Sequence, residues 1–186
     1  MWMPITLLGI CGSMRRGSLN RALLVAVGET LPEGATLRQW DSLDLPIFST
    51  DLEDPPAVVA LKRAIAEADG VVFAVPEYNY SIPGGLKNAI DWISNPPAKS
   101  PLRGKPCAII GAASGMSGTI RAQAHMRQIL LYSDSPVLSQ PEILVARAYE
   151  RFDAEGRLID TVTREWLTKF GAALVRYIER HAPRTS

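Results

Sequence analysis

Several features that mark large classes of protein are scarce in this 186-residue sequence. It has two cysteines, Cys11 and Cys107, which are too few for a disulfide or zinc framework. Its 20 basic residues nearly balance its 19 acidic residues, so the net charge is +1. That balance leaves no broad basic surface, and we expect no binding to nucleic acid or to anionic lipid.

Hydrophobic runs long enough to span a bilayer are also missing from the sequence. Residues 1–11 are mostly apolar, but they have no basic leader and Pro4 interrupts them. We therefore interpret this segment as a buried strand and not as a signal peptide. The few cysteines favour a reducing compartment, and we expect a cytoplasmic protein that does not enter membranes.

Apolar runs alternate with helical patterns along the whole chain. Strands are expected at 5–11, 35–40, 70–75 and 107–111 and within 137–145, and helices at 19–27, 54–68, 83–93, 117–131 and from 161. Asp54, Pro83 and either Ser117 or Thr119 are the expected helix-start residues. This alternation predicts a single domain over residues 1–186, with a three-layer α/β fold. Five strands favour the flavodoxin-like doubly wound parallel sheet of order 2-1-3-4-5.

In such sheets a ligand binds beyond the carboxyl ends of the strands. The first loop there, residues 12–20, has a Gly-Ser-x-Arg-x-x-Ser-x-Asn pattern and leads directly into a helix. Backbone N–H groups at a helix start suit a phosphate, and an arginine adds charge. The loop lacks both the Gly-Lys-Ser/Thr ending and a Gly-x-Gly-x-x-Gly turn, so a monophosphate fits better than a triphosphate or dinucleotide. An ordinary strand-to-helix turn is the alternative.

The second loop, residues 76–85, reads Pro-Glu-Tyr-Asn-Tyr-Ser-Ile-Pro-Gly-Gly. Aromatic faces beside amide groups can hold a planar heteroaromatic ring, although Tyr80 in particular could instead pack beneath a neighbouring helix. The third loop, residues 111–118, consists mainly of glycine, alanine and serine. Such small residues let backbone amides approach a ligand closely.

Together the three loops resemble those of the NAD(P)H-dependent FMN reductase family, which includes quinone, azo-dye and chromate reductases. The resemblance extends from Ile5 to about Leu131, and its most specific stretch is residues 76–92. It implies that Ser13, Arg15, Ser18 and Asn20 hold the FMN phosphate, that Glu77, Tyr78 and Asn79 lie along the isoalloxazine ring, and that Ser114 and Gly115 lie near its polar edge. Leu19 and Pro76 complete the predicted cofactor-binding set.

The function expected from this resemblance is a two-step reaction. Hydride passes from NADPH or NADH to FMN, and a small acceptor such as a quinone, flavin, azo dye or chromate-type ion then takes the electrons. This chemistry needs no catalytic side chain and no metal ion. We expect His125 and His181 to lie away from all three loops, and both cysteines to be buried and inert. A flavodoxin-type electron carrier and a flavin-based redox sensor remain alternatives.

Members of this family commonly pair through helices, so the resemblance also implies a homodimer or homotetramer. Residues 86–93 carry Leu86, Ile90, Ile93 and Trp92, which is more apolar surface than one sheet-facing side needs. A subunit interface on this helix is one interpretation, and core packing is the other.

Overall fold

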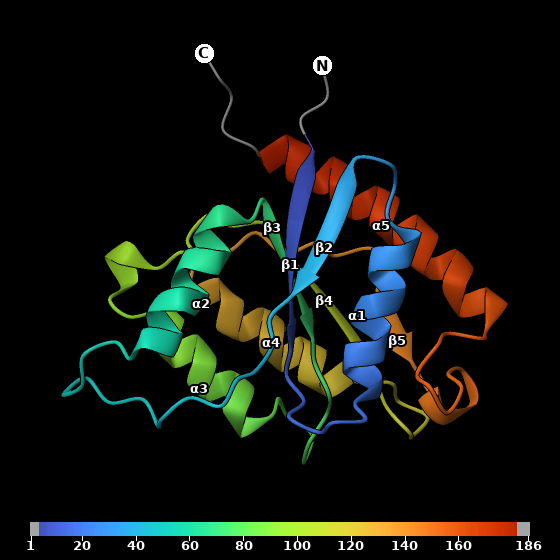
Figure 1. The fold of residues 1–186 in the computed structure, drawn as a ribbon, viewed down its shortest axis with the longest axis horizontal. Coiled ribbons are helices and arrows are strands. Elements are labelled where there is room, and N and C mark those ends of the chain that lie inside the picture. Colours follow the sequence, from blue (N-terminus) through green and yellow to red (C-terminus); the bar gives the residue numbers. More distant parts are fainter. Residues whose placement is uncertain (1–3, 182–186) are drawn as a thin grey trace.

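In the computed structural model, which describes residues 4–181, a five-stranded parallel sheet lies between two layers of helices (Figure 1). The strand order is β2-β1-β3-β4-β5, as predicted. The strands are β1 (Ile5–Cys11), β2 (Ala35–Gln39), β3 (Gly70–Ala74), β4 (Cys107–Ala112) and β5 (Ile143–Val145). The main helices are α1 (Leu19–Thr30), α2 (Pro56–Glu67), α3 (Gly84–Ile93), α4 (Ile120–Tyr132) and α5 (Thr161–His181).

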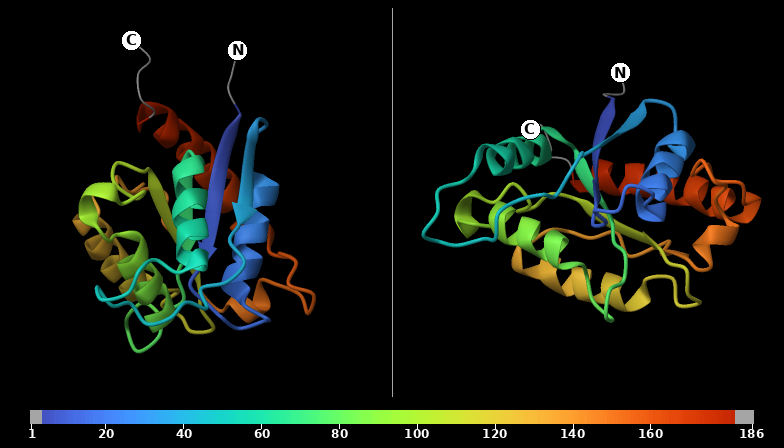
Figure 2. Two further views of the ribbon diagram at one scale, coloured as in Figure 1. Left: turned by 60° about the vertical axis from the view of Figure 1, so that its left-hand side comes forward. Right: turned by 60° about the horizontal axis from the view of Figure 1, so that its bottom comes forward.

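The sheet separates two hydrophobic cores, and the alternation of side chains along each strand assigns residues to one or the other. In β1, Leu7 and Cys11 face the layer of α1 and α5, whereas Leu8 and Ile10 face the layer of α2, α3 and α4. Figure 2 shows the two helical layers on opposite sides of the sheet. Because both faces are covered, the central strands are almost continuously apolar, which is why they were recognisable in the sequence.

The fifth strand is shorter than the expected segment. Only Ile143–Val145 pairs with β4, and Val137 forms an isolated bridge to Cys107. Between them the chain leaves the sheet around Pro141, which has no N–H to donate to a strand ladder. Two short 3-10 turns, Pro97–Lys99 and Ala148–Glu150, lie in the remaining connections.

Two of the expected helix starts are wrong. Pro55, not Asp54, is the N-cap of α2, and Asp54 instead forms an ion pair with Lys62. Pro83 is the N-cap of α3 and not its first helical residue. Within residues 4–181 no helix is long and apolar enough to cross a membrane.

Candidate functional site

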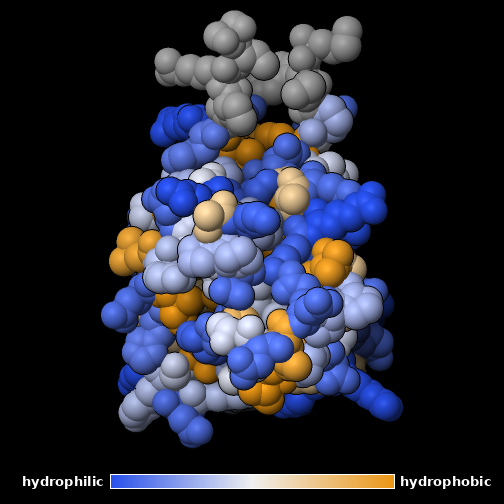
Figure 3. All heavy atoms as spheres, turned by 90° about the vertical axis from the view of Figure 1, so that its left-hand side faces the viewer, coloured by the Kyte–Doolittle hydropathy of each residue, from blue (hydrophilic) through white to orange (hydrophobic). Residues whose placement is uncertain are grey.

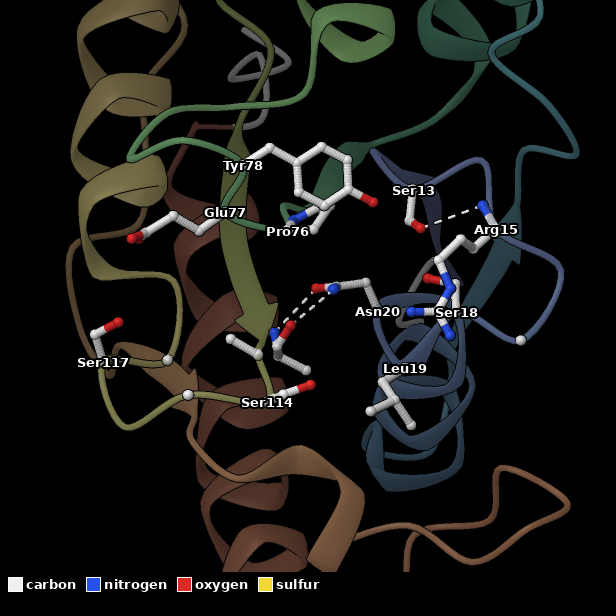
Figure 4. Close-up of a pocket in the computed structure, with 15 residues that line it drawn as sticks. Ser13, Arg15, Ser18, Leu19, Asn20, Pro76, Glu77, Tyr78, Ser114 and Ser117 are labelled. Carbon is white, nitrogen blue, oxygen red and sulfur yellow. Dashed lines mark hydrogen bonds between the residues drawn. The ribbon is translucent and has the colours of Figure 1, made fainter.

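The three loops meet at the carboxyl edge of the sheet and line a cleft of about 370 Å³ (Figure 4). Small-molecule sites commonly measure roughly 300–1,000 Å³. The predicted residues that line this cleft are Ser13, Arg15, Ser18, Leu19, Asn20, Pro76, Glu77, Tyr78, Ser114 and Gly115. Asn79 does not line it.

Five further residues line the cleft but were not singled out from the sequence: Gly17, Ala112, Ala113, Ser117 and Gly118. All five belong to the first and third loops or border them. The signal for the last four was present in the run of small residues after β4, because side chains of that size leave room beside the backbone.

The first loop presents a helix start to the cleft. Ser18 is the N-cap of α1, and its Oγ accepts a hydrogen bond of 3.3 Å from the Arg21 amide. The amides of Leu19 and Asn20 lie in the first helical turn, where N–H groups have no intrahelical acceptor. The first turn has no acidic residue, and the Arg15 side chain lies beside Ser18 (Figure 4). This arrangement favours an anion at the start of α1.

The Cys11 thiol packs inside this loop. Its Sγ donates to the Ser13 carbonyl oxygen at 3.6 Å and lies 3.6 Å from Ser18 Oγ, and the residue is buried. Gly12 follows it, and a Cβ there would lie 2.9 Å from Leu86 Cδ2. Glycine at this position therefore lets the first loop pack closely against Leu86 and Pro76.

Asn20 connects the first loop to the third. Its Nδ2 donates to the Ala112 carbonyl at 2.8 Å, and its Oδ1 accepts from the Ala112 amide at 2.9 Å (Figure 4). The side chain is buried, and both polar atoms are engaged with the backbone. Asn20 thus lines the cleft as expected, but its main contacts fix the distance between the two loops.

The third loop is also held from its other side. The Ala148 amide donates to the Ala113 carbonyl at 3.0 Å, and the Arg147 amide donates to the Gly115 carbonyl at 3.1 Å. At Gly111 a Cβ would lie 1.8 Å from Thr119 Oγ1, so only glycine fits between β4 and the start of α4. The backbone around Ser114 is therefore fixed before any ligand arrives.

In the second loop, Pro76 and Tyr78 face the cleft, whereas the Glu77 carboxylate turns toward α4 (Figure 4). Glu77 Oε2 accepts from the Arg121 and Ala122 amides at 3.0 and 3.3 Å, and Oε1 accepts from Arg121 Nη1 at 2.9 Å. Burial disfavours the charged carboxylate, but these hydrogen bonds outweigh it and hold the pKa of Glu77 below its usual value.

Glu77 therefore caps α4 from a distant part of the chain. Thr119, one of the two residues expected to do so, occupies the N-cap position but makes no side-chain cap hydrogen bond. The sequence could not indicate this substitute cap, because Glu77 lies 44 residues before Arg121.

The part of the 76–92 stretch that lies on α3 holds the segment of chain that follows β2. Asn88 Oδ1 accepts from the Phe48 amide at 2.8 Å, and Asn88 Nδ2 donates to the Pro46 carbonyl at 2.9 Å. Trp92 Nε1 donates to the same carbonyl at 2.8 Å. These two residues on α3 hold the chain after β2 in place, and no residue of the conspicuous pattern at 86–92 lines the cleft.

The expectation that both histidines lie away from the loops is wrong for His125. Its Nδ1 lies 2.9 Å from Ser81 Oγ in the second loop. His181 is distant from the cleft, and its Nδ1 lies 2.8 Å from the Tyr177 carbonyl. Cys107 is buried, and burial raises the pKa of its thiol to about 12, so it is inert as expected.

The apolar surplus on α3 is explained by packing within this chain. Leu86, Ile90, Trp92 and Ile93 are all buried. On the side of the molecule formed by α2 and α3, apolar residues appear only in separate groups among hydrophilic ones (Figure 3). The interpretation of this stripe as a subunit interface is therefore wrong.

The fold is that of a flavodoxin-like α/β protein, and its cleft lies at the carboxyl edge of the sheet, between the start of the first helix and the loops after β3 and β4. Comparison with known proteins is more specific. The family model for NADPH-dependent FMN reductases matches residues 5–150, and the chain belongs to that family. The predicted family and fold are thus confirmed, and the match extends beyond the residues that suggested it.

The relatives match almost the whole chain. An NAD(P)H-dependent FMN reductase of Pseudomonas aeruginosa is 44% identical, over 95% of this chain and 96% of the relative. A quinone reductase of Escherichia coli is 39% identical, over 92% and 94%. The solved structure of a flavoenzyme NAD(P)H:(acceptor) oxidoreductase from Paracoccus denitrificans has a TM-score of 0.87 at 35% identity, over 95% of this chain and 98% of that chain.

Proposed function

We propose that this chain binds FMN in the cleft and passes electrons from NADPH or NADH to small acceptors of the quinone type. The FMN phosphate binds at the start of α1, and the isoalloxazine ring lies between the second and third loops. When bound, FMN would supply the redox chemistry, as the acceptor of a hydride from the nicotinamide and the donor of electrons to the acceptor.

The observation that carries this proposal is the distribution of charged groups in the cleft. Among the described residues that line it, Glu77 is the one carboxylate, and its oxygens are bonded to Arg121 and Ala122 on α4. The acid is thereby turned away from the α1 end, where Arg15 and the free helical amides favour a phosphate. The chemistry of the lining residues fits FMN.

In this proposal, the residues of the chain bind FMN and orient its ring. Ser13, Ser18 and the first-turn amides of α1 offer donors to a phosphate, and Tyr78 offers an aromatic face to the ring. Ser114 and Gly115, fixed by the backbone bonds around them, offer amides to the polar edge of the ring.

The relatives support the acceptor class. The Pseudomonas and Escherichia proteins are described as an FMN reductase and a quinone reductase. Another relative, from a Burkholderia species, is described as a 2-hydroxy-1,4-benzoquinone reductase. We therefore place quinones first among the acceptors, ahead of free flavin, azo dyes and chromate-type ions.

The test is an anaerobic reduction. The protein is purified with added FMN, its visible spectrum is recorded, and NADPH or NADH is added without oxygen, followed by 1,4-benzoquinone. Rapid bleaching of the flavin band that reverses on adding the quinone is the expected result. A bound flavin that stays oxidised would favour an electron carrier or sensor, and failure to bind FMN would refute the proposed site.

The assembly and the compartment belong to the same proposal. The α4 helix exposes Ile120, Leu131 and Tyr132, which supports pairing into a homodimer or homotetramer through that side. Both cysteines are free, which supports a reducing cytoplasmic location. Sedimentation at micromolar concentration tests the assembly, and a monomer would contradict it.

A further inference from the structure

The tip of the second loop is a tight two-residue turn. The Tyr78 amide donates to the Ser81 carbonyl and the Ser81 amide donates to the Tyr78 carbonyl, both at 2.9 Å. Asn79 and Tyr80 lie between them with φ angles of +50° and +64°. Two successive residues with positive φ define a type I′ turn, for which Asn-Gly is the preferred sequence.

Tyr80 is a poor residue for its place in this turn. A bulky side chain at positive φ is strained, whereas glycine adopts the same conformation freely. Tyr80 as a whole residue is also 67% exposed, so burial in the core does not hold it there. Strained backbone of this kind persists only when surrounding contacts enforce it.

Those contacts come from two successive turns of α4. The Arg121 guanidinium lies 4.2 Å from the centre of the Tyr80 ring while it also binds Glu77. One turn further along, His125 Nδ1 lies 2.9 Å from Ser81 Oγ. Arg121 and His125 thus contact the residues that enter, form and leave the turn.

We propose that Arg121 and His125 are positioning residues that hold the turn, and through it the Tyr78 ring, at the ring-binding side of the cleft. Tyr78 begins the turn and points into the cleft opposite Ser13 and Asn20 (Figure 4). Any change in the backbone conformation of the turn therefore moves the Tyr78 ring within the cleft. This inference rests on the proposed function, because the quantity that it controls is the binding of FMN.

The first test removes one contact at a time and measures the dissociation constant for FMN by quenching of flavin fluorescence. Replacing either partner, Ser81→Ala or His125→Ala, should weaken FMN binding about 2- to 10-fold, as expected for one hydrogen bond. The double variant should be no weaker than the single variants, because both remove the same contact. His181→Ala, on α5 and away from the cleft, is the matched control and should bind FMN like the wild type.

A second comparison separates positioning from general stability. His125→Asn places an amide near the position of Nδ1 and should restore the wild-type affinity, whereas His125→Ala should not. The visible circular dichroism of bound FMN should shift in the alanine variant and return in the asparagine variant. Melting temperatures of the FMN-free proteins show whether any variant is simply less folded.

The most specific test removes the backbone strain at Tyr80. Tyr80→Gly converts the turn to Asn-Gly, which forms a type I′ turn without outside support. In that background, His125→Ala should change FMN binding less than twofold. An undiminished effect there, or equal affinities for wild type and both His125 variants, would overturn the inference. Absence of FMN binding by the wild type would instead refute the proposed function.

Discussion

The strongest prediction concerns Asn20, because among residues 4–181 it is the one whose side chain joins the first and third loops through paired, buried hydrogen bonds. Replacing it with alanine leaves the Ala112 N–H and C=O groups buried and unpaired. Each lost bond costs about 1–2 kcal/mol, so the free energy of unfolding should fall by about 2–4 kcal/mol. For a chain of this size that corresponds to roughly 4–16 °C in melting temperature.

The measurement is urea unfolding of the FMN-free protein, followed by far-ultraviolet circular dichroism. Gln128→Ala, an exposed polar residue on α4, is the control, and its stability should stay within about 0.5 kcal/mol of the wild type. If Asn20→Ala also stays within that margin, the amide does not hold the two loops together. That result would refute the assignment of Asn20 as their link.

A second substitution at the same position separates stability from binding. Asn20→Asp can still accept from the Ala112 amide, but it loses the donor and adds a negative charge near the start of α1. FMN binding should therefore suffer more in Asn20→Asp than in Asn20→Ala, since the carboxylate repels the phosphate. The reverse order would contradict the placement of the phosphate at this helix.

Three further predictions concern individual ionisable side chains. Arg15→Ala should weaken FMN binding by about 1.5–3 kcal/mol, roughly 10- to 150-fold in a fluorescence titration, whereas Arg63→Ala on α2 should change nothing. The folded-state pKa of Glu77 lies below its usual 4.5, so its carboxylate stabilises the fold above that pH and this contribution is lost as pH falls. The stability difference between wild type and Glu77→Gln should therefore be largest near neutral pH and shrink below about pH 4 in urea unfolding. Cys107 should resist iodoacetamide at pH 8 while the protein is folded and react after unfolding, as read by mass spectrometry; modification of the native protein would contradict its burial.

The strands and the location of the site were predictable because their signals are local. A strand covered on both faces must be apolar along its length, and the runs at 5–11, 70–75 and 107–111 show this directly. The three loops that line the cleft follow those runs, so their positions could be predicted from the order of the strands. The extent of β5 was not predictable, since a three-residue strand is shorter than the pattern that reveals it.

The contacts that shape the cleft were not predictable because each joins residues far apart in the chain. Asn20 binds a residue 92 positions away, and Glu77 and Ser81 each bind α4 across 44 positions. The residue types were consistent with ligand binding. The sequence alone does not show that the side chains of Asn20 and Glu77 form hydrogen bonds within the protein instead. Only the fold distinguishes a side chain that is free to contact a ligand from one that positions the loops lining the cleft.

The division of the core into two layers has an evolutionary consequence. One side of the cleft, where we propose that the phosphate binds, is formed by the start of α1, which packs with α5 on one face of the sheet. The second loop leads into α3 and is held by α4 on the other face. Substitutions in the α3–α4 layer therefore act first on the side of the cleft that Tyr78 lines, whereas substitutions in the α1–α5 layer act first on the side formed by the start of α1. A scaffold divided in this way lets a lineage vary one side of the cleft while the residues of the opposite side stay in place.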